Sequence, residues 1–271
     1  HLNSIMVENN GVQGPSYINS FNSNESDIKI NLENMIKLVE IASNYCTINV
    51  SNIEIKRHLN EIVGTNYVAD LLSHVKSLSK FYVSWSDVGD LGLKSFFSSI
   101  TSVNHLTEIK IRDCNFTEIG MKSISNLIVD CISLKSLDLS KNNFGEKGAE
   151  NLALGLAECP DLIHLNLSFN LFGPKGAAFL TNSLKVCKKL RALEIRNNAI
   201  GYEGANYLSE ALEKMALLKV LDVSSNCLGK EGARVITEAL ASADLEILDI
   251  GSNNIGPIGC KYLADSLLNV K

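Results

Sequence analysis

Histidine and cysteine are the residues of this sequence that could act as bases, nucleophiles or metal ligands. The chain of 271 residues contains 5 histidines and 7 cysteines. No histidine lies near a cysteine, serine or carboxylate at a spacing typical of a catalytic or zinc site. The sequence also lacks Cys-x-x-Cys, Gly-x-Ser-x-Gly, His-Glu-x-x-His and phosphate-loop motifs. We therefore expect a protein that is not an enzyme and that holds no metal and no cofactor.

The spacing of three cysteines indicates a repeated structure instead. Cys131, Cys159 and Cys187 follow one another at steps of 28 residues. If they occupy the same place in successive structural units, neighbouring cysteines lie too far apart for a disulfide, which needs Cα atoms within about 7 Å. We expect these thiols to be small buried side chains of a core. Cys227 and Cys260 are expected in a loop and on a helix face.

Leucines repeat with the same step along most of the chain. The sequence that begins at Leu134 (Leu-Lys-Ser-Leu-Asp-Leu-Ser-Lys-Asn-Asn-Phe-Gly-Glu-Lys-Gly-Ala) returns in the same frame. The equivalent leucines are Leu78, Leu106, Leu162, Leu190, Leu218 and, one residue early, Leu245. Alternating apolar residues at the start of each unit predict a strand, and apolar residues three and four apart in its second half predict a helix. Residues 78–271 are therefore interpreted as seven units of 27–28 residues.

One polar position recurs between the predicted strand and helix. It is occupied by Asn142, Asn170, Asn198, Asn226 and Asn253, and by Cys114 in an earlier unit. An amide turned inward there would satisfy backbone groups that a tight turn leaves without hydrogen bonds. We interpret these asparagines as a structural ladder. Glycines such as Gly145, just before the helix, are interpreted as residues that permit tight backbone geometry.

This pattern resembles the leucine-rich repeats of the ribonuclease-inhibitor-like class, which occur in the ribonuclease inhibitor, NOD-like receptors and Ran GTPase-activating proteins. The resemblance implies an α/β leucine-rich-repeat solenoid, a horseshoe of right-handed βα units. Parallel strands about 4.8 Å apart would line its concave face, and helices about 8–10 Å apart would cover its convex face. The length of the units also favours a cytoplasmic protein, because the repeats of extracellular receptors are typically shorter.

Upstream of Leu78 the pattern weakens. Residues 50–55 fall in frame with the later strands, and residues 2–7 again suit the strand of a unit. Residues 13–27 have the polar, turn-rich composition of an inserted loop, and residues 31–44 suit a helix. Residues 1–77 are therefore interpreted either as degenerate N-terminal repeats or as a divergent cap.

Side chains that alternate with the buried strand residues are expected to face outward on the concave wall. The expected partner-binding residues are Tyr82, Trp85, Lys110, Arg112, Asp138, His164, Asn166, Phe169, Glu194, Arg196, Asp222 and Asp249. The column that follows the central one, which includes Ser84, Ser140, Ser168 and Ser224, is expected to face outward as well.

Two groups stand out on this wall. Tyr82, Trp85, Lys110 and Arg112 form an aromatic–basic cluster near its N-terminal end, and Glu194, Asp222 and Asp249 form an acidic stripe near the other end. Because Trp, Tyr and Arg are frequent at binding hot spots, we expect the aromatic–basic cluster at the centre of an interface. The alternative is that these polar side chains only solvate the strand wall.

Composition narrows the class of partner. A net charge of −5 and a pI near 5.6 argue against a nucleic-acid-binding face. No apolar stretch approaches the roughly 20 residues that span a membrane. We therefore expect a protein partner, no nucleic acid and no membrane insertion. The last predicted helix, near residues 258–268, has no polar unit after it, so we also expect self-association through this end.

The expected function is protein–protein interaction through the concave face, for example as the repeat region of a larger NOD-like sensor. Two alternatives remain open. One is a regulator of a small GTPase, which the resemblance to Ran GTPase-activating proteins suggests, although none of that family's functional residues is matched here. The other is an inhibitor of a basic enzyme, which the acidic stripe favours.

Overall fold

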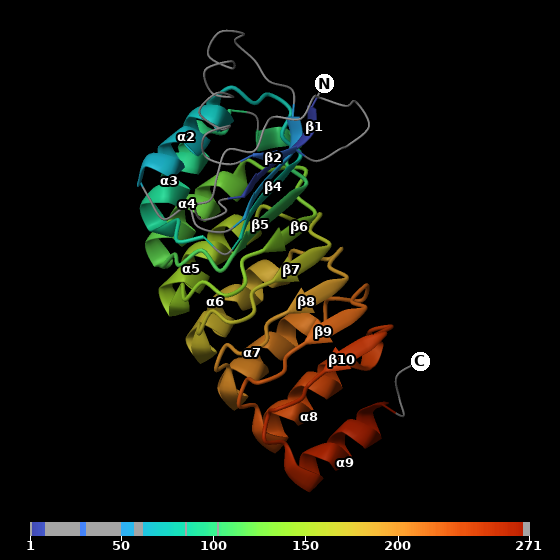
Figure 1. Cartoon of the computed structure of the whole chain (residues 1–271). Coiled ribbons are helices and arrows are strands. Elements are labelled where there is room, and N and C mark those ends of the chain that lie inside the picture. Colours follow the sequence, from blue (N-terminus) through green and yellow to red (C-terminus); the bar gives the residue numbers. More distant parts are fainter. Residues whose placement is uncertain are drawn as a thin grey trace.

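The computed structural model describes residues 2–8, 28–30, 50–56, 62–84, 86–101 and 103–267. In this part the chain forms a curved stack with strands on one side and helices on the other (Figure 1). The strands are β1 (Leu2–Glu8), β2 (Ile28–Ile30), β3 (Val50–Lys56), β4 (Lys80–Ser84), β5 (Glu108–Arg112), β6 (Ser136–Asp138), β7 (His164–Asn166), β8 (Ala192–Glu194), β9 (Val220–Asp222) and β10 (Ile247–Asp249). The helices are α2 (Ile62–Ser73), α3 (Gly89–Ser99), α4 (Glu118–Val129), α5 (Gly145–Leu156), α6 (Gly173–Leu184), α7 (Gly201–Leu212), α8 (Gly229–Ala239) and α9 (Gly256–Leu267), with short 3₁₀ helices η1 (Val103–His105) and η2 (Leu240–Ser242).

The described strands form one parallel sheet of ten strands, in the order β10-β9-β8-β7-β6-β5-β4-β3-β1-β2. From β3 to β10 each strand pairs with the next one in the sequence, and a helix connects the two. Leu137 pairs with Leu165, which pairs with Leu193. The 28-residue step therefore brings equivalent residues side by side, which confirms the predicted α/β solenoid.

The curvature follows from what is buried between the two layers. Leu165 on the sheet is 1% exposed, and Ala149 and Leu152 on α5 are fully buried in the same core. Packed helices need about 8–10 Å between their axes, whereas paired strands lie about 4.8 Å apart. A stack of such units must therefore open on the helical side and bend toward the strands, as Figure 1 shows.

A row of phenylalanines supports the turns that lead into the helices. Phe116, Phe144 and Phe172 are at most 1% exposed, and their rings stack with centroids 6.3 and 6.5 Å apart. Gly145 follows Phe144 with a φ of 64°, a left-handed conformation that glycine adopts without a steric penalty. The tight geometry predicted for this glycine is thus confirmed.

The N-terminal strands extend the sheet beyond β3. β1 pairs with β3, with Ile5 opposite Ile53. On its other edge β1 pairs with β2, a strand that the repeat did not predict, with Ile5 opposite Ile28. The loop predicted at 13–27 and the helix predicted at 31–44 lie outside the described residues. Whether residues 1–77 are degenerate repeats or a cap stays a prediction.

Apolar surface is exposed at the other end of the described stack. Ile247 on β10 and Ile258 on α9 are 58% and 51% exposed. Leu248 and Ile250 are only partly buried, whereas Leu221 in the preceding strand is fully buried. The self-association expected from this end stays a prediction, which light scattering over a concentration series would test. A monomer mass at every concentration would contradict it.

Candidate functional site

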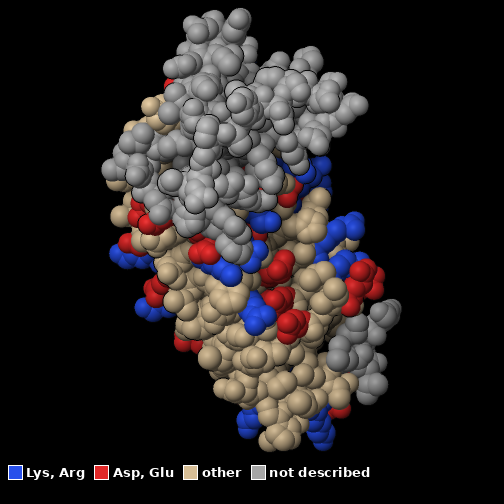
Figure 2. Space-filling model, in the orientation of Figure 1, with Lys and Arg blue, Asp and Glu red and all other residues tan. Residues whose placement is uncertain are grey.

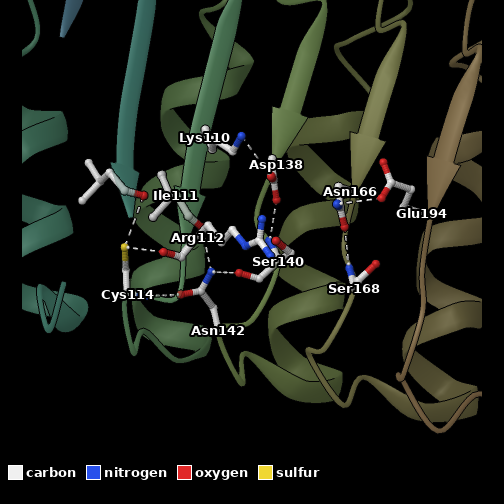
Figure 3. Close-up of polar contacts among 11 residues, drawn as sticks. Lys110, Ile111, Arg112, Cys114, Asp138, Ser140, Asn142, Asn166, Ser168 and Glu194 are labelled. Atoms are coloured by element: carbon white, nitrogen blue, oxygen red, sulfur yellow. Dashed lines mark hydrogen bonds and ion pairs between the residues drawn. The ribbon is translucent and has the colours of Figure 1, made fainter. Parts of the chain in front are cut away.

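The asparagine ladder lies behind the wall, at the turn after each strand. Asn142 donates from Nδ2 to the carbonyl oxygens of Ile111 (2.7 Å) and Leu139 (2.9 Å), and its Oδ1 accepts from the backbone N–H of Cys114 (2.8 Å; Figure 3). The backbone N–H of Asn142 in turn donates to Oδ1 of Asn170 at 2.9 Å. The same bond links Asn170, Asn198, Asn226 and Asn253 in succession, and all of these side chains are buried. The ladder therefore belongs to the scaffold that positions the wall.

Cysteines also occupy scaffold positions. Cys114 takes the ladder position of its repeat, and its Sγ donates to the carbonyl oxygens of Arg112 (3.3 Å) and Val83 (3.5 Å). Burial raises the pKa of the Cys187 thiol to about 12, so this thiol stays protonated and unreactive at neutral pH. The three cysteines of the 28-residue column, Cys131, Cys159 and Cys187, are buried and free, as predicted.

The concave wall brings the central residues of seven strands into one row. These residues are Tyr82, Lys110, Asp138, Asn166, Glu194, Asp222 and Asp249, each opposite the next in the paired strands. A depression of about 320 Å³ lies within the row, over β5 to β8. Its polar lining residues are Glu108, Lys110, Ser136, Asp138, His164, Asn166 and Glu194, of which His164 is exposed. Figure 2 shows acidic and basic side chains gathered beside one another on this face.

Of the two cations in the aromatic–basic cluster, Lys110 is paired with an acidic residue of the neighbouring strand, and Lys80 beside the cluster is paired in the same way. Lys80 Nζ lies 3.0 Å from Glu108 Oε2, and Lys110 Nζ lies 3.9 Å from Asp138 Oδ2. Burial and a hydrogen bond with Glu108 raise the pKa of Tyr82. Burial acts against ionisation of Glu108, but hydrogen bonds from Tyr82 and Lys80 outweigh it and lower the pKa of Glu108. These residues form cross-strand pairs and not an open positive patch.

The other two members of the cluster are Arg112 and Trp85. Arg112 is partly buried, and Figure 3 shows its side chain running toward Asp138 and Ser140. Within the described part of the chain, neither Arg112 Nε nor the Ser140 hydroxyl has a hydrogen-bond partner, although both atoms are buried. Trp85 lies outside the described residues, so its place at the centre of an interface stays a prediction.

The column that follows the central row does not face outward throughout, contrary to expectation. Ser84, Ser140, Ser168 and Ser224 are only 3–7% exposed. The chain turns toward the ladder at this point, so small side chains are covered. The longer side chain of Arg196 remains exposed.

Most acidic and amide side chains of the central row have a structural role that the sequence analysis missed. Asp138, Asn166, Asp222 and Asp249 each accept, through Oδ1, a hydrogen bond of 2.9–3.0 Å from the backbone N–H two residues later. Such Asx turns fix the end of each strand. Glu194 makes no bond of this kind; its Oε2 accepts from Asn166 Nδ2 at 3.1 Å (Figure 3).

Glu194 therefore differs from the other carboxylates of the row. Among the described residues, its only hydrogen-bond donor is the neutral Asn166 amide. Burial raises the pKa of Glu194, and the negative charges of Asp138 and Asp222 raise it further. His164 and Arg112 act in the opposite direction without compensating for this. A carboxylate in such surroundings gains from an added positive charge.

We expect Glu194→Gln to stabilise the fold at pH 7. Because the folded-state pKa of Glu194 is raised, its protonated form stabilises the fold at low pH. That contribution is lost as the pH rises through the unfolded-state and then the folded-state pKa. Glutamine carries no charge and keeps an acceptor oxygen for Asn166. Thermal melts between pH 3 and pH 8 should show equal stability in acid and a more stable variant at pH 7; a variant no more stable at pH 7 would contradict this.

Phe169 lies beyond the central row, between two cations from neighbouring repeats. Lys141 Nζ and the guanidinium carbon of Arg196 each lie 5.7 Å from the centroid of the Phe169 ring. The ring is partly exposed. Lys141 was not among the predicted wall residues, because its left-handed backbone, with a φ of 62°, breaks the strand alternation.

The described residues contain neither a candidate metal cluster nor a candidate membrane-spanning helix. Within them, no group of three His, Cys, Asp or Glu side chains is placed to hold a metal ion. None of the helices described combines the length and the apolar character that crossing a membrane requires.

Comparison with known families agrees with this architecture. A family model described as Leucine Rich repeat matches residues 104–125, 130–153, 158–180, 186–209, 214–236 and 241–264, just over half of the chain. Each matched segment includes one strand of the wall and most of the helix that follows it. Comparison with curated proteins finds no match. Domains of this kind are generally protein-interaction modules. The repeated strand and helix, the buried ladder and the six matched segments together show that the chain belongs to the leucine-rich repeat family.

Proposed function

We propose that the chain is a protein-interaction module whose concave wall binds a protein partner, and that Glu194 accepts a lysine or arginine side chain of that partner. The observation that carries the proposal is the environment of Glu194. This carboxylate lines a depression in the wall, is partly buried, and has other carboxylates as its nearest charged neighbours in the row.

The charges around Glu194 support a cationic ligand group. Lys110 is paired with Asp138, at 3.9 Å. Asp222 already accepts hydrogen bonds from the backbone N–H and the hydroxyl of Ser224, at 2.9 and 2.6 Å. A cation entering the depression of about 320 Å³ would therefore find Glu194 as its principal counter-ion. Truncating one member of a buried charge pair typically costs about 2–5 kcal/mol of binding free energy.

Glu194→Lys should reduce capture of the partner from the native source at least tenfold, because a cation at this position repels the incoming cation. Glu203→Lys is the matched control. It makes the same change of charge on the exposed surface of α7 and should capture the partner as the wild type does. Quantitative mass spectrometry of the retained proteins measures both. If the wild type and Glu194→Lys retained the same proteins equally, the binding surface would lie on the helices or the loops instead.

Inhibition of a basic enzyme is the second candidate, and the acidic environment of Glu194 favours it. Such binding should weaken strongly with salt, because the Debye length falls from about 10 Å at 0.1 M to about 3 Å at 1 M. A captured enzyme that loses its activity when bound at low salt would support this candidate.

If the chain only binds its partner and does not inhibit it, we propose that it is the repeat region of a larger NOD-like sensor. Regulation of a small GTPase would require faster GTP hydrolysis on addition of the protein.

A further inference from the structure

In the described repeats from β5 to β10, two residues with left-handed backbone flank the ladder position. Their φ values lie between 47° and 62°. The pairs are Asp113 and Asn115, Lys141 and Asn143, Phe169 and Leu171, Asn197 and Ala199, Ser225 and Cys227, and Ser252 and Asn254. Asn and Asp tolerate this conformation best after glycine, whereas a bulky side chain in it is unusual and costs free energy.

One pair departs from this preference. Phe169 and Leu171 are both large and apolar, whereas most of the other pairs are polar or small. Leu171 is 58% exposed and Phe169 is partly exposed, so neither side chain fills the core. Folding therefore gains little from the apolar side chain of Leu171 at a position that disfavours it. The left-handed backbone costs free energy, and burial of the side chain does not offset that cost. Such uncompensated strain is characteristic of residues that bind a ligand or a partner.

The charges beside this pair indicate the chemistry of the ligand. Lys141 and Arg196 flank the Phe169 ring at 5.7 Å, and both cations are exposed. In the part of the chain that the structure describes, neither forms an ion pair, whereas Lys80 and Lys110 on the wall do. Two cations without an ion pair, each near a partly exposed aromatic ring, can pair with carboxylates that flank an apolar side chain.

We infer that Phe169, Leu171, Lys141 and Arg196 form an anchor site for an acidic protein segment. This deepens the proposed function and rests on it. An aromatic or large aliphatic side chain of the segment packs on Phe169 and Leu171, and the aspartate or glutamate residues beside it pair with Lys141 and Arg196. Phenylalanine and arginine are both enriched in the cores of protein–protein interfaces.

Single-stranded nucleic acid is the other macromolecule that an aromatic ring between two cations could bind. The wall beside the anchor site argues against it. Asp138, Glu194 and Asp222 lie in the adjoining row, and a phosphate backbone extending from the anchor site over that row would meet negative charge. The net charge of −5 also argues against binding of nucleic acid.

The double variant Phe169→Asn with Leu171→Asn tests the inference without disturbing the fold. Asparagine already occupies the equivalent left-handed positions at Asn197 and Asn143, so the variant should melt at or above the wild-type temperature. The matched control is Ile132→Asn with Tyr202→Asn, which removes two exposed apolar side chains elsewhere, 74% and 50% exposed. The probe is a displayed library of random twelve-residue peptides, selected on the wild-type chain.

We expect the selected peptides to contain an aromatic or large aliphatic residue next to Asp or Glu. A fluorescent peptide of the selected sequence should bind the double variant at least tenfold more weakly than the wild type and bind the control unchanged. Basic peptides, no enrichment, equal affinity for the double variant, or displacement of the peptide by oligouridylate would overturn the inference. Peptide binding lost in Glu194→Lys but kept in the double variant would leave the proposed function standing and refute the anchor site. Binding kept in both variants would refute the anchor site, whereas the proposed function is tested separately by capture of the natural partner with Glu194→Lys.

Discussion

Asn198→Ala is expected to lower the free energy of unfolding by about 3–4 kcal/mol. The Asn198 amide donates to the carbonyl oxygens of Leu167 and Ile195, both at 2.9 Å, and accepts from the backbone N–H of Asn170 at 2.9 Å. Alanine leaves that N–H buried without a partner, at a cost of about 1–3 kcal/mol. The two carbonyls keep one donor each, from the Asn170 and Asn226 amides, so their loss is the smaller part.

Urea denaturation followed by circular dichroism measures this loss. Asn206→Ala is the control, because Asn206 is exposed on α7 and alanine favours a helix. Asn198→Cys should lose less than the alanine variant, since Cys114 fills the same position in its own repeat and donates to two carbonyl oxygens. Wild-type stability in both Asn198→Ala and Asn170→Ala would show that the ladder does not stabilise the fold.

The 28-residue repeat was enough to predict the scaffold, because the same positions of each repeat are buried in a solenoid. Leu137, Leu165 and Leu193 occupy equivalent places in three strands, and their pairing follows directly from the 28-residue step. Where the repeat is absent, the sequence did not predict the structure. β2 has only three residues and matches no position of the repeat. The β1–β2 pairing depends on contacts that a local pattern does not encode.

The wall was predicted less well because its chemistry depends on side-chain length and on the turn that follows each strand. Asp222 and Glu194 carry the same charge in the same column, yet only the shorter side chain accepts from the backbone N–H two residues later. The neutralisation of Lys110 by Asp138 likewise joins residues of adjacent repeats. The sequence therefore identified the central row of the wall but could not assign the partners of its side chains.

Phe144→Ala is expected to cost about 3–5 kcal/mol of stability, the usual price of removing a buried aromatic side chain and leaving a cavity. Phe144 is 1% exposed and stacks between Phe116 and Phe172, with ring planes inclined by only 14° and 9°. The cavity would open between three consecutive repeats. Because each repeat is stabilised mainly by its neighbours, the loss would weaken two interfaces at once.

Phe144→Leu distinguishes this packing from a local requirement at the helix start. Leu228 fills the equivalent place before α8, where it is 2% exposed, so the turn itself accepts leucine. The leucine variant should therefore lose only about 1 kcal/mol, since most of the buried volume is retained. Urea denaturation of the two variants measures the difference. Equal losses in Phe144→Ala and Phe144→Leu would mean that the stacked rings, and not the filled volume, hold these repeats together.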